Sequence, residues 1–170
     1  MEEMRVYVAQ QIQHEEHSIE LKINQEDTAE LLEMKMIQLY RDSVESLKET
    51  LDSDSLEKAC ALLRSANRIY LLGVGTSGLI AYDLYHRLNR YGKTTFYNTD
   101  AHMSLEFTQQ STAQDVIVAI SYSGLTEEVV VGAEAAQIRD TPVISILSNT
   151  ESPLAKATDI QLVIPQTEHL

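Results

Sequence analysis

Residues 69–78 read Ile-Tyr-Leu-Leu-Gly-Val-Gly-Thr-Ser-Gly, an apolar run that ends in a turn of glycines and hydroxyl side chains. Residues 116–126 read Val-Ile-Val-Ala-Ile-Ser-Tyr-Ser-Gly-Leu-Thr and repeat this arrangement. After each turn the apolar residues recur at helical spacing. A strand that enters a helix through such a turn is the unit of a parallel sheet, so the two stretches predict an α/β fold.

The two turns also predict a binding site for a phosphate group. Each turn directs the first backbone N–H groups of a helix, and the positive end of its dipole, beyond the carboxyl end of a strand. Glycine allows close approach to the backbone, and hydroxyls donate hydrogen bonds. The hydroxyls expected at this site are those of Thr76, Ser77, Ser121, Ser123 and Thr126. For a single turn, the alternative is that serine and threonine only cap a helix.

Two nucleotide-binding motifs do not fit this chain. Gly73, Gly75 and Gly78 have the spacing of the dinucleotide fingerprint, but that motif also needs an acidic residue about twenty positions later, at the end of a second strand. Asp100, the nearest candidate, comes too late. No Gly-Lys-Ser or Gly-Lys-Thr triplet occurs, so the P-loop is absent as well.

Strand and helix patterns alternate along most of the chain. The expected strands cover about 69–72, 94–97, 116–120, 143–147 and 160–164. The expected helices between them cover 77–91, 101–110, 126–139 and 153–157. The third and fourth strands are almost wholly apolar, as strands buried on both faces must be. The pattern predicts a three-layer α/β/α sandwich around a five-stranded parallel sheet.

Two helices are expected before the first strand. Apolar residues recur every three or four positions between Thr28 and Thr50, which predicts an amphipathic helix whose stripe we interpret as a dimer interface. Asp54 and Glu57 are expected to cap a second helix that runs through Leu63. On this helix Cys60, the single cysteine, is expected to lie in the core.

The ends of the chain differ from its centre. Residues 1–27 are polar and acidic, and we interpret them as a linker or the remainder of another domain. The last expected strand is followed only by residues 165–170, which leaves it without the covering helix that a parallel sheet requires. We therefore expect that a partner chain covers this strand or that the chain is a fragment.

The composition excludes several classes of protein. Thirteen Lys and Arg against 26 Asp and Glu give a formal net charge of −13, which repels nucleic acid. One cysteine allows no internal disulfide, no segment is apolar enough to span a membrane, and the start lacks a signal peptide, so we expect a cytoplasmic protein. His14 and His17 lie three residues apart without a third ligand, so we expect no metal ion and no cofactor.

With the two turns in view, the chain resembles the SIS (sugar isomerase) domain over residues 55–165. The most specific part of the resemblance is Ser121-Tyr-Ser-Gly-Leu-Thr126, together with Gly73-Val-Gly-Thr-Ser77. The resemblance implies a flavodoxin-like phosphosugar-binding fold. Within the family, the helical lead-in, Arg90-Tyr-Gly92 and Asp100-Ala-His102 look most like the effector domain of RpiR/MurR-type transcriptional regulators.

The resemblance implies roles for single residues. Ser121, Ser123 and Thr126 would hold the phosphate beside the first turn, and His102 would approach the sugar. The full set of expected phosphosugar-binding residues is Gly75, Thr76, Ser77, His102, Ser121, Tyr122, Ser123, Gly124 and Thr126. Tyr122 departs from the small or amide-bearing residues often found between the two serines.

The resemblance further implies an organisation and a function. Residues 28–170 would form the SIS domain, and residues 1–27 would be the end of an N-terminal helix-turn-helix domain that is otherwise absent, as is the final helix. We expect a dimeric, non-enzymatic effector domain that reaches DNA only through such a helix-turn-helix domain. One alternative is an aldose-ketose phosphosugar isomerase with His102 or Glu128 as base. Another is an inactive dimerisation module.

Overall fold

The computed structural model describes residues 23–166 of the chain. The chain divides into two compact units, residues 1–45 with 167–170 and residues 46–166, which are described separately. The expectations for residues 1–22, His14 and His17 among them, lie outside the described residues.

Helix α2 (Ala29–Thr50), most of which belongs to the first unit, is close to the helix expected from the sequence. The Thr28 hydroxyl accepts the backbone N–H of Leu31 at 3.2 Å and so caps the first turn. Large apolar side chains along this helix remain exposed, most of all Tyr40 at 68% and Val44 at 62%. Helix α2 is therefore amphipathic, with part of its apolar side open.

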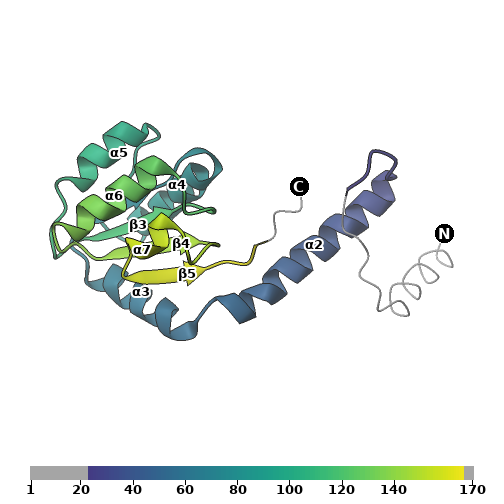
Figure 1. The fold of residues 1–170 in the computed structure, drawn as a ribbon, viewed down its shortest axis with the longest axis horizontal. Coiled ribbons are helices and arrows are strands. Elements are labelled where there is room, and N and C mark those ends of the chain that lie inside the picture. The colour runs from purple at the N-terminus through teal and green to yellow at the C-terminus, as the bar shows by residue number, and fades with distance from the viewer. Residues whose placement is uncertain (1–22, 167–170) are drawn as a thin grey trace. The chain divides into compact units, whose positions relative to one another are not determined.

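The second unit is built on a five-stranded parallel sheet with the strand order β2-β1-β3-β4-β5. Figure 1 labels β3, β4 and β5 of this sheet. Its strands are β1 (Ile69–Leu72), β2 (Thr95–Phe96), β3 (Val116–Ile120), β4 (Val143–Leu147) and β5 (Ile160–Val163). All five residues of β3 are buried, whereas those of β5, at the sheet edge, are half-buried. The expected parallel α/β sheet is confirmed.

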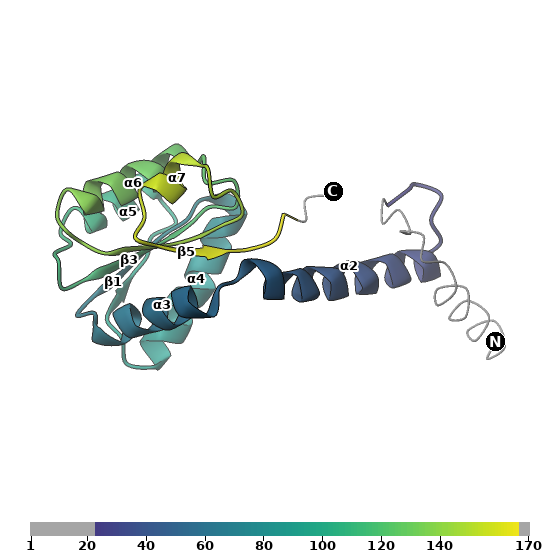
Figure 2. The same cartoon turned by 60° about the horizontal axis from the view of Figure 1, so that its bottom comes forward.

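Helices cover both faces of the sheet, as the two views in Figures 1 and 2 show. The helices of the second unit are α3 (Ser53–Ser65), α4 (Gly75–Arg90), α5 (Ala101–Thr108), α6 (Glu127–Gln137) and α7 (Pro153–Lys156). Helices α3 and α4 pack on one face through Ala59 and Ala81. Helices α6 and α7 pack on the other through Val129 and Leu154, with Phe107 of α5 beside them. The expected three-layer sandwich is therefore present.

Two expectations for the second helix are wrong. Its N-cap is Asp52, whose carboxylate accepts the Ser55 N–H at 2.8 Å, and not Asp54, which lies inside the first turn. Cys60 is exposed, because the neighbouring Ala59 faces the sheet at 1% exposure and one residue turns the helix by about 100°. The apolar character of cysteine did not show which side of the helix is buried.

An ion pair joins the amino-terminal ends of β1 and β3. The Arg68 guanidinium donates to both carboxylate oxygens of Asp115, at 3.0 Å and 2.7 Å. Asp115 is almost fully buried, and it also accepts the N–H and the hydroxyl of Thr112 at 2.9 Å each. This fully bonded carboxylate holds the amino-terminal ends of β1 and β3 together. The glycine turns lie at the opposite, carboxyl ends of the same strands.

Candidate functional site

The candidate site lies where the strand order of the sheet reverses. Strands β1 and β3 are neighbours, but β2 lies beyond β1 on one side and β4 beyond β3 on the other. The helices that follow, α4 and α6, therefore leave the sheet toward opposite faces. At such a point the turns after the two strands separate and leave a crevice outside their carboxyl ends, where open α/β sheets bind ligands.

The first turn covers Gly73 to Ser77 and opens helix α4. Gly75 has φ of 61°, in the left-handed region that favours glycine. The side chain of Thr76 is exposed and that of Ser77 is half-buried. The N-cap residue is Val74, which has no side-chain oxygen to accept a helix N–H.

The second turn covers Ser121 to Thr126 and opens helix α6. Ser121 is 2% exposed, and its hydroxyl lies 3.0 Å from the hydroxyl of Thr126, the N-cap residue. Ser123 is exposed, and its hydroxyl accepts the Leu125 N–H at 3.3 Å. Gly124 has φ of 69° and lies buried under the turn. The two serines therefore differ: Ser121 supports the turn from below, whereas Ser123 is open to solvent.

The helices that begin at these turns differ from the other helices of residues 23–166 at their first turn. Neither α4 nor α6 has a side-chain hydrogen bond to its first N–H groups. The other helices are each capped by a side-chain oxygen, from Thr28, Asp52, Asp100 and Ser152. The Val129 N–H donates to the Thr126 carbonyl at 3.1 Å, but the two N–H groups before it in α6 and the first ones of α4 have no partner found within residues 23–166 and so remain available to an anion.

The charge of the turns restricts how a ligand can be held. Neither turn contains Lys or Arg, and Glu127 and Glu128 occupy the first turn of α6. An anion would thus be bound by N–H groups, hydroxyls and helix dipoles. The two carboxylates are well placed for the helix dipole whatever the ligand.

The structure brings most of the expected site residues together. Those of the first turn, Gly75, Thr76 and Ser77, and those of the second, Ser121, Tyr122, Ser123, Gly124 and Thr126, lie at the carboxyl ends of adjacent strands. His102 is exposed in the first turn of α5, which follows β2, and its backbone N–H donates to Asp100 at 2.8 Å. None of the hydrogen bonds found within residues 23–166 links His102 to either turn.

A third turn, which the sequence reasoning missed, supports the second one. Strand β4 is followed by Ser148, whose hydroxyl donates to the Tyr122 carbonyl at 2.8 Å. Ser152 packs against Gly124 from the start of α7. The signal was present in the sequence, because Leu147-Ser-Asn-Thr150 is again an apolar strand that ends in hydroxyl and amide side chains.

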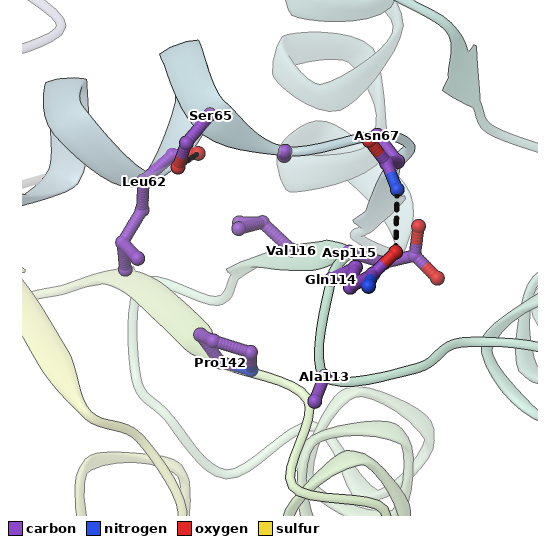
Figure 3. A pocket seen from close by; sticks show the side chains of 9 residues that line it. Leu62, Ser65, Asn67, Ala113, Gln114, Asp115, Val116 and Pro142 are labelled. Carbon is purple, nitrogen blue, oxygen red and sulfur yellow. Dashed lines mark hydrogen bonds between the residues drawn. The ribbon is translucent and has the colours of Figure 1, made fainter.

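A cavity of about 420 Å³ lies at the opposite, amino-terminal edge of the sheet and is shown in Figure 3. It is lined by the apolar residues Leu62, Val116 and Pro142 and by polar residues, among them Asn67 and Gln114. At its rim the Asn67 amide donates to the Gln114 amide at 2.8 Å. It is therefore separate from the glycine turns, and the candidate site does not depend on it.

Neither a candidate metal site nor a membrane-spanning helix is found within residues 23–166. No group of three or more His, Cys, Asp or Glu side chains in this range is arranged to hold a metal ion. No helix of the same range is both long and apolar enough to cross a membrane.

Comparisons with known proteins agree with the fold. The SIS domain family matches residues 62–170. An uncharacterised HTH-type transcriptional regulator of Clostridium perfringens is 29% identical over 169 residues, which cover 98% of this chain and 61% of that protein. The chain thus spans about three-fifths of the length of this relative.

The chain is also similar to several solved structures. Vibrio vulnificus NanR in complex with ManNAc-6P is 31% identical, with a TM-score of 0.77, over 81% of this chain and 52% of that chain. The sugar isomerase domain of an RpiR transcription factor from Sphaerobacter thermophilus is 23% identical, with a TM-score of 0.68, over 76% and 75% of the two chains. A Methanococcus jannaschii protein interpreted as a 3-hexulose-6-phosphate isomerase shares the fold at 22% identity, with a TM-score of 0.65, over 79% and 73%.

Proposed function

Because this chain belongs to the SIS domain family, we propose that its two glycine turns bind the phosphate of a sugar phosphate and that the domain is the effector-binding part of an RpiR-type transcriptional regulator. The regulators among its relatives support this role, as does NanR, which was solved with a sugar phosphate. DNA contacts would come from a helix-turn-helix domain outside this chain. The proposed site residues are those of the two turns, with His102 near the sugar.

One observation supports the proposal most directly: among the helices of residues 23–166, α4 and α6 lack a side-chain cap, and both begin at the strand-order reversal. A phosphate between the two turns would accept their free N–H groups and the Thr76 and Ser123 hydroxyls. A site without a dedicated cation favours modest affinity, which suits reversible sensing. The ligand would change the regulator by binding one conformation of the dimer more tightly than another.

The test is a phosphorus NMR titration of the purified chain with hexose, pentose and amino-sugar phosphates. We expect shifted or broadened phosphorus resonances with the wild type and no new product peaks. Ser123→Ala should weaken binding about 10- to 100-fold, because a hydrogen bond to a charged group contributes about 1.5–3 kcal/mol. Ser121→Ala should weaken it about fivefold, because it removes one neutral hydrogen bond below the turn. The loss with Ser121→Ala would come through Thr126, whose hydroxyl loses its partner.

A matched control is available for Ser121. Ser111 is also a buried serine whose hydroxyl lies 3.0 Å from a threonine hydroxyl, that of Thr141, but at the amino-terminal edge of the sheet. Ser111→Ala should therefore leave binding unchanged. New product peaks would instead show the isomerase, with Glu128→Gln and His102→Ala identifying the base, and no binding by any sugar phosphate would refute the proposed site.

We also propose that the exposed apolar side of α2 is a dimer interface. Tyr40 and Val44 are four residues apart on this helix and are 68% and 62% exposed. Contiguous exposed apolar side chains mark a surface that another chain covers. The double variant Tyr40→Glu, Val44→Glu should change the sedimentation coefficient from that of a dimer to that of a monomer.

The neighbouring Arg41 provides the control for this prediction. It is exposed on the same helix, so Arg41→Glu introduces a carboxylate there without removing an apolar side chain. This variant should sediment as the wild type does. A wild type that sediments as a monomer, or a double variant that remains dimeric, would disprove the interface.

A further inference from the structure

The turn after β4 holds the turn after β3 at several points. The Ser121 N–H donates to the Ile146 carbonyl at 3.1 Å, and the Leu154 N–H donates to the Gly124 carbonyl at 3.2 Å. Between these two bonds, Ser148 contacts Tyr122. The second turn is therefore not held by its own residues alone, because its backbone is bonded at both ends and in the middle to the β4–α7 segment.

Ser148 makes the central contact with two donors. Its backbone N–H lies 2.9 Å and its hydroxyl 2.8 Å from the same acceptor, the carbonyl oxygen of Tyr122. A carbonyl that accepts two hydrogen bonds from one residue has little freedom to rotate. Of the two donors, only the hydroxyl can be removed by mutation without changing the backbone.

Fixing this carbonyl also fixes a donor on the other side of the peptide. The peptide bond is planar and trans, so the Ser123 N–H points away from the Tyr122 carbonyl within the same plane. Among residues 23–166 no acceptor is bonded to the Ser123 N–H. The side chain of Ser123 is exposed. The direction of this free N–H is thus set by Ser148.

We infer that Ser148 is a positioning residue for anion binding: by holding the Tyr122 carbonyl it aims the Ser123 N–H at the phosphate. Ser148 itself does not need to touch the ligand. This inference rests on the proposed function of the two turns as a phosphosugar site, and it adds a residue from the turn after a third strand, β4, to that site.

The test compares Ser148→Ala with Ser148→Thr and Ser145→Ala. Threonine keeps the hydroxyl. Ser145, on strand β4 just before this turn, is fully buried with its hydroxyl 3.1 Å from that of Thr158, so Ser145→Ala removes a comparable hydrogen bond away from the second turn. The dissociation constants of inorganic phosphate and of the tightest-binding sugar phosphate are measured by phosphorus NMR.

Ser148→Ala should raise the dissociation constants of both ligands by the same factor, about fivefold. The factor is shared because both ligands contain the phosphate, and its size is that of one lost neutral hydrogen bond. Ser148→Thr should restore affinity, and Ser145→Ala should leave it unchanged. Unchanged affinity in Ser148→Ala, or an equal loss in Ser145→Ala, would overturn the inference. A loss confined to the sugar phosphate would also overturn it, because that would indicate contact with the sugar.

A second measurement separates this inference from the proposed function. The Gly124 N–H donates to the Ser121 carbonyl at 3.1 Å inside the turn, so its hydrogen exchange reports whether the turn is held. In the unliganded chain this exchange should be about fivefold faster in Ser148→Ala than in Ser145→Ala. If the wild type binds no phosphate, the proposed function is wrong. If the Gly124 N–H exchanges equally fast in Ser148→Ala and Ser145→Ala, the positioning role of Ser148 is wrong, whether or not phosphate binds.

Discussion

Replacing Gly124 by alanine is expected to destabilise the second unit by about 3 kcal/mol. Gly124 has φ of 69°, where an added side chain costs roughly 1–2 kcal/mol, and overpacking adds roughly 1–3 kcal/mol. The methyl group would lie 2.5 Å from the Ser152 Cβ and closer still to its hydroxyl. Urea unfolding followed by circular dichroism measures the free energy of unfolding, and phosphate binding should be lost together with the geometry of the turn.

Gly75 provides the control for the effect of φ alone. It has φ of 61°, but a methyl group there would meet nothing within 4 Å. Gly75→Ala should therefore cost only about 1–2 kcal/mol. Adding Ser152→Gly to Gly124→Ala should recover part of the larger loss, because it removes the clashing side chain. If Gly124→Ala costs no more than Gly75→Ala, the contact with Ser152 does not constrain the turn.

Asp115→Asn is expected to be the second large effect, with a loss of about 2–3 kcal/mol at pH 7. Removing one partner of a buried ion pair usually costs about 3–5 kcal/mol, and the 35% exposure of the Arg68 side chain reduces this value. The measurement is again the free energy of unfolding in urea. Asp83→Asn is the control, because Asp83 and Arg87 pair at 2.7 Å with side chains 60% and 68% exposed, so that solvent screens the pair and its loss should hardly change the free energy of unfolding.

The effect of Asp115→Asn should depend on pH. Burial by itself would raise the pKa of Asp115, but hydrogen bonds from Arg68 and Thr112 outweigh it and hold this pKa below the ordinary value of 3.8. A group with a lowered pKa in the folded state stabilises the protein fully above its unfolded pKa and loses this contribution as the pH falls through the folded pKa. The difference between wild type and Asp115→Asn should therefore be constant above about pH 5 and shrink below pH 4. A difference that does not change down to pH 2 would contradict this account.

Local patterns predicted the sheet closely. The expected strands at 69–72, 116–120 and 143–147 have the same bounds as β1, β3 and β4. These strands are buried on both faces, so a short apolar run marks each of them without ambiguity. Helix ends were less accurate: α4 begins at Gly75 and not at residue 77, because the left-handed Gly75 already belongs to the first helical turn.

The sequence by itself determined the parallel α/β fold and the two hydroxyl turns, because apolar periodicity and glycine turns act over neighbouring residues. Only the tertiary structure decided which of the hydroxyl side chains are exposed to solvent. Ser121 and Ser123 have similar sequence positions, yet one is buried against Thr126 and the other is exposed. It also decided that Ser148 and Ser152 support Tyr122 and Gly124. These contacts join residues 26 and 28 positions apart along the chain, and they arise only because β4 pairs with β3.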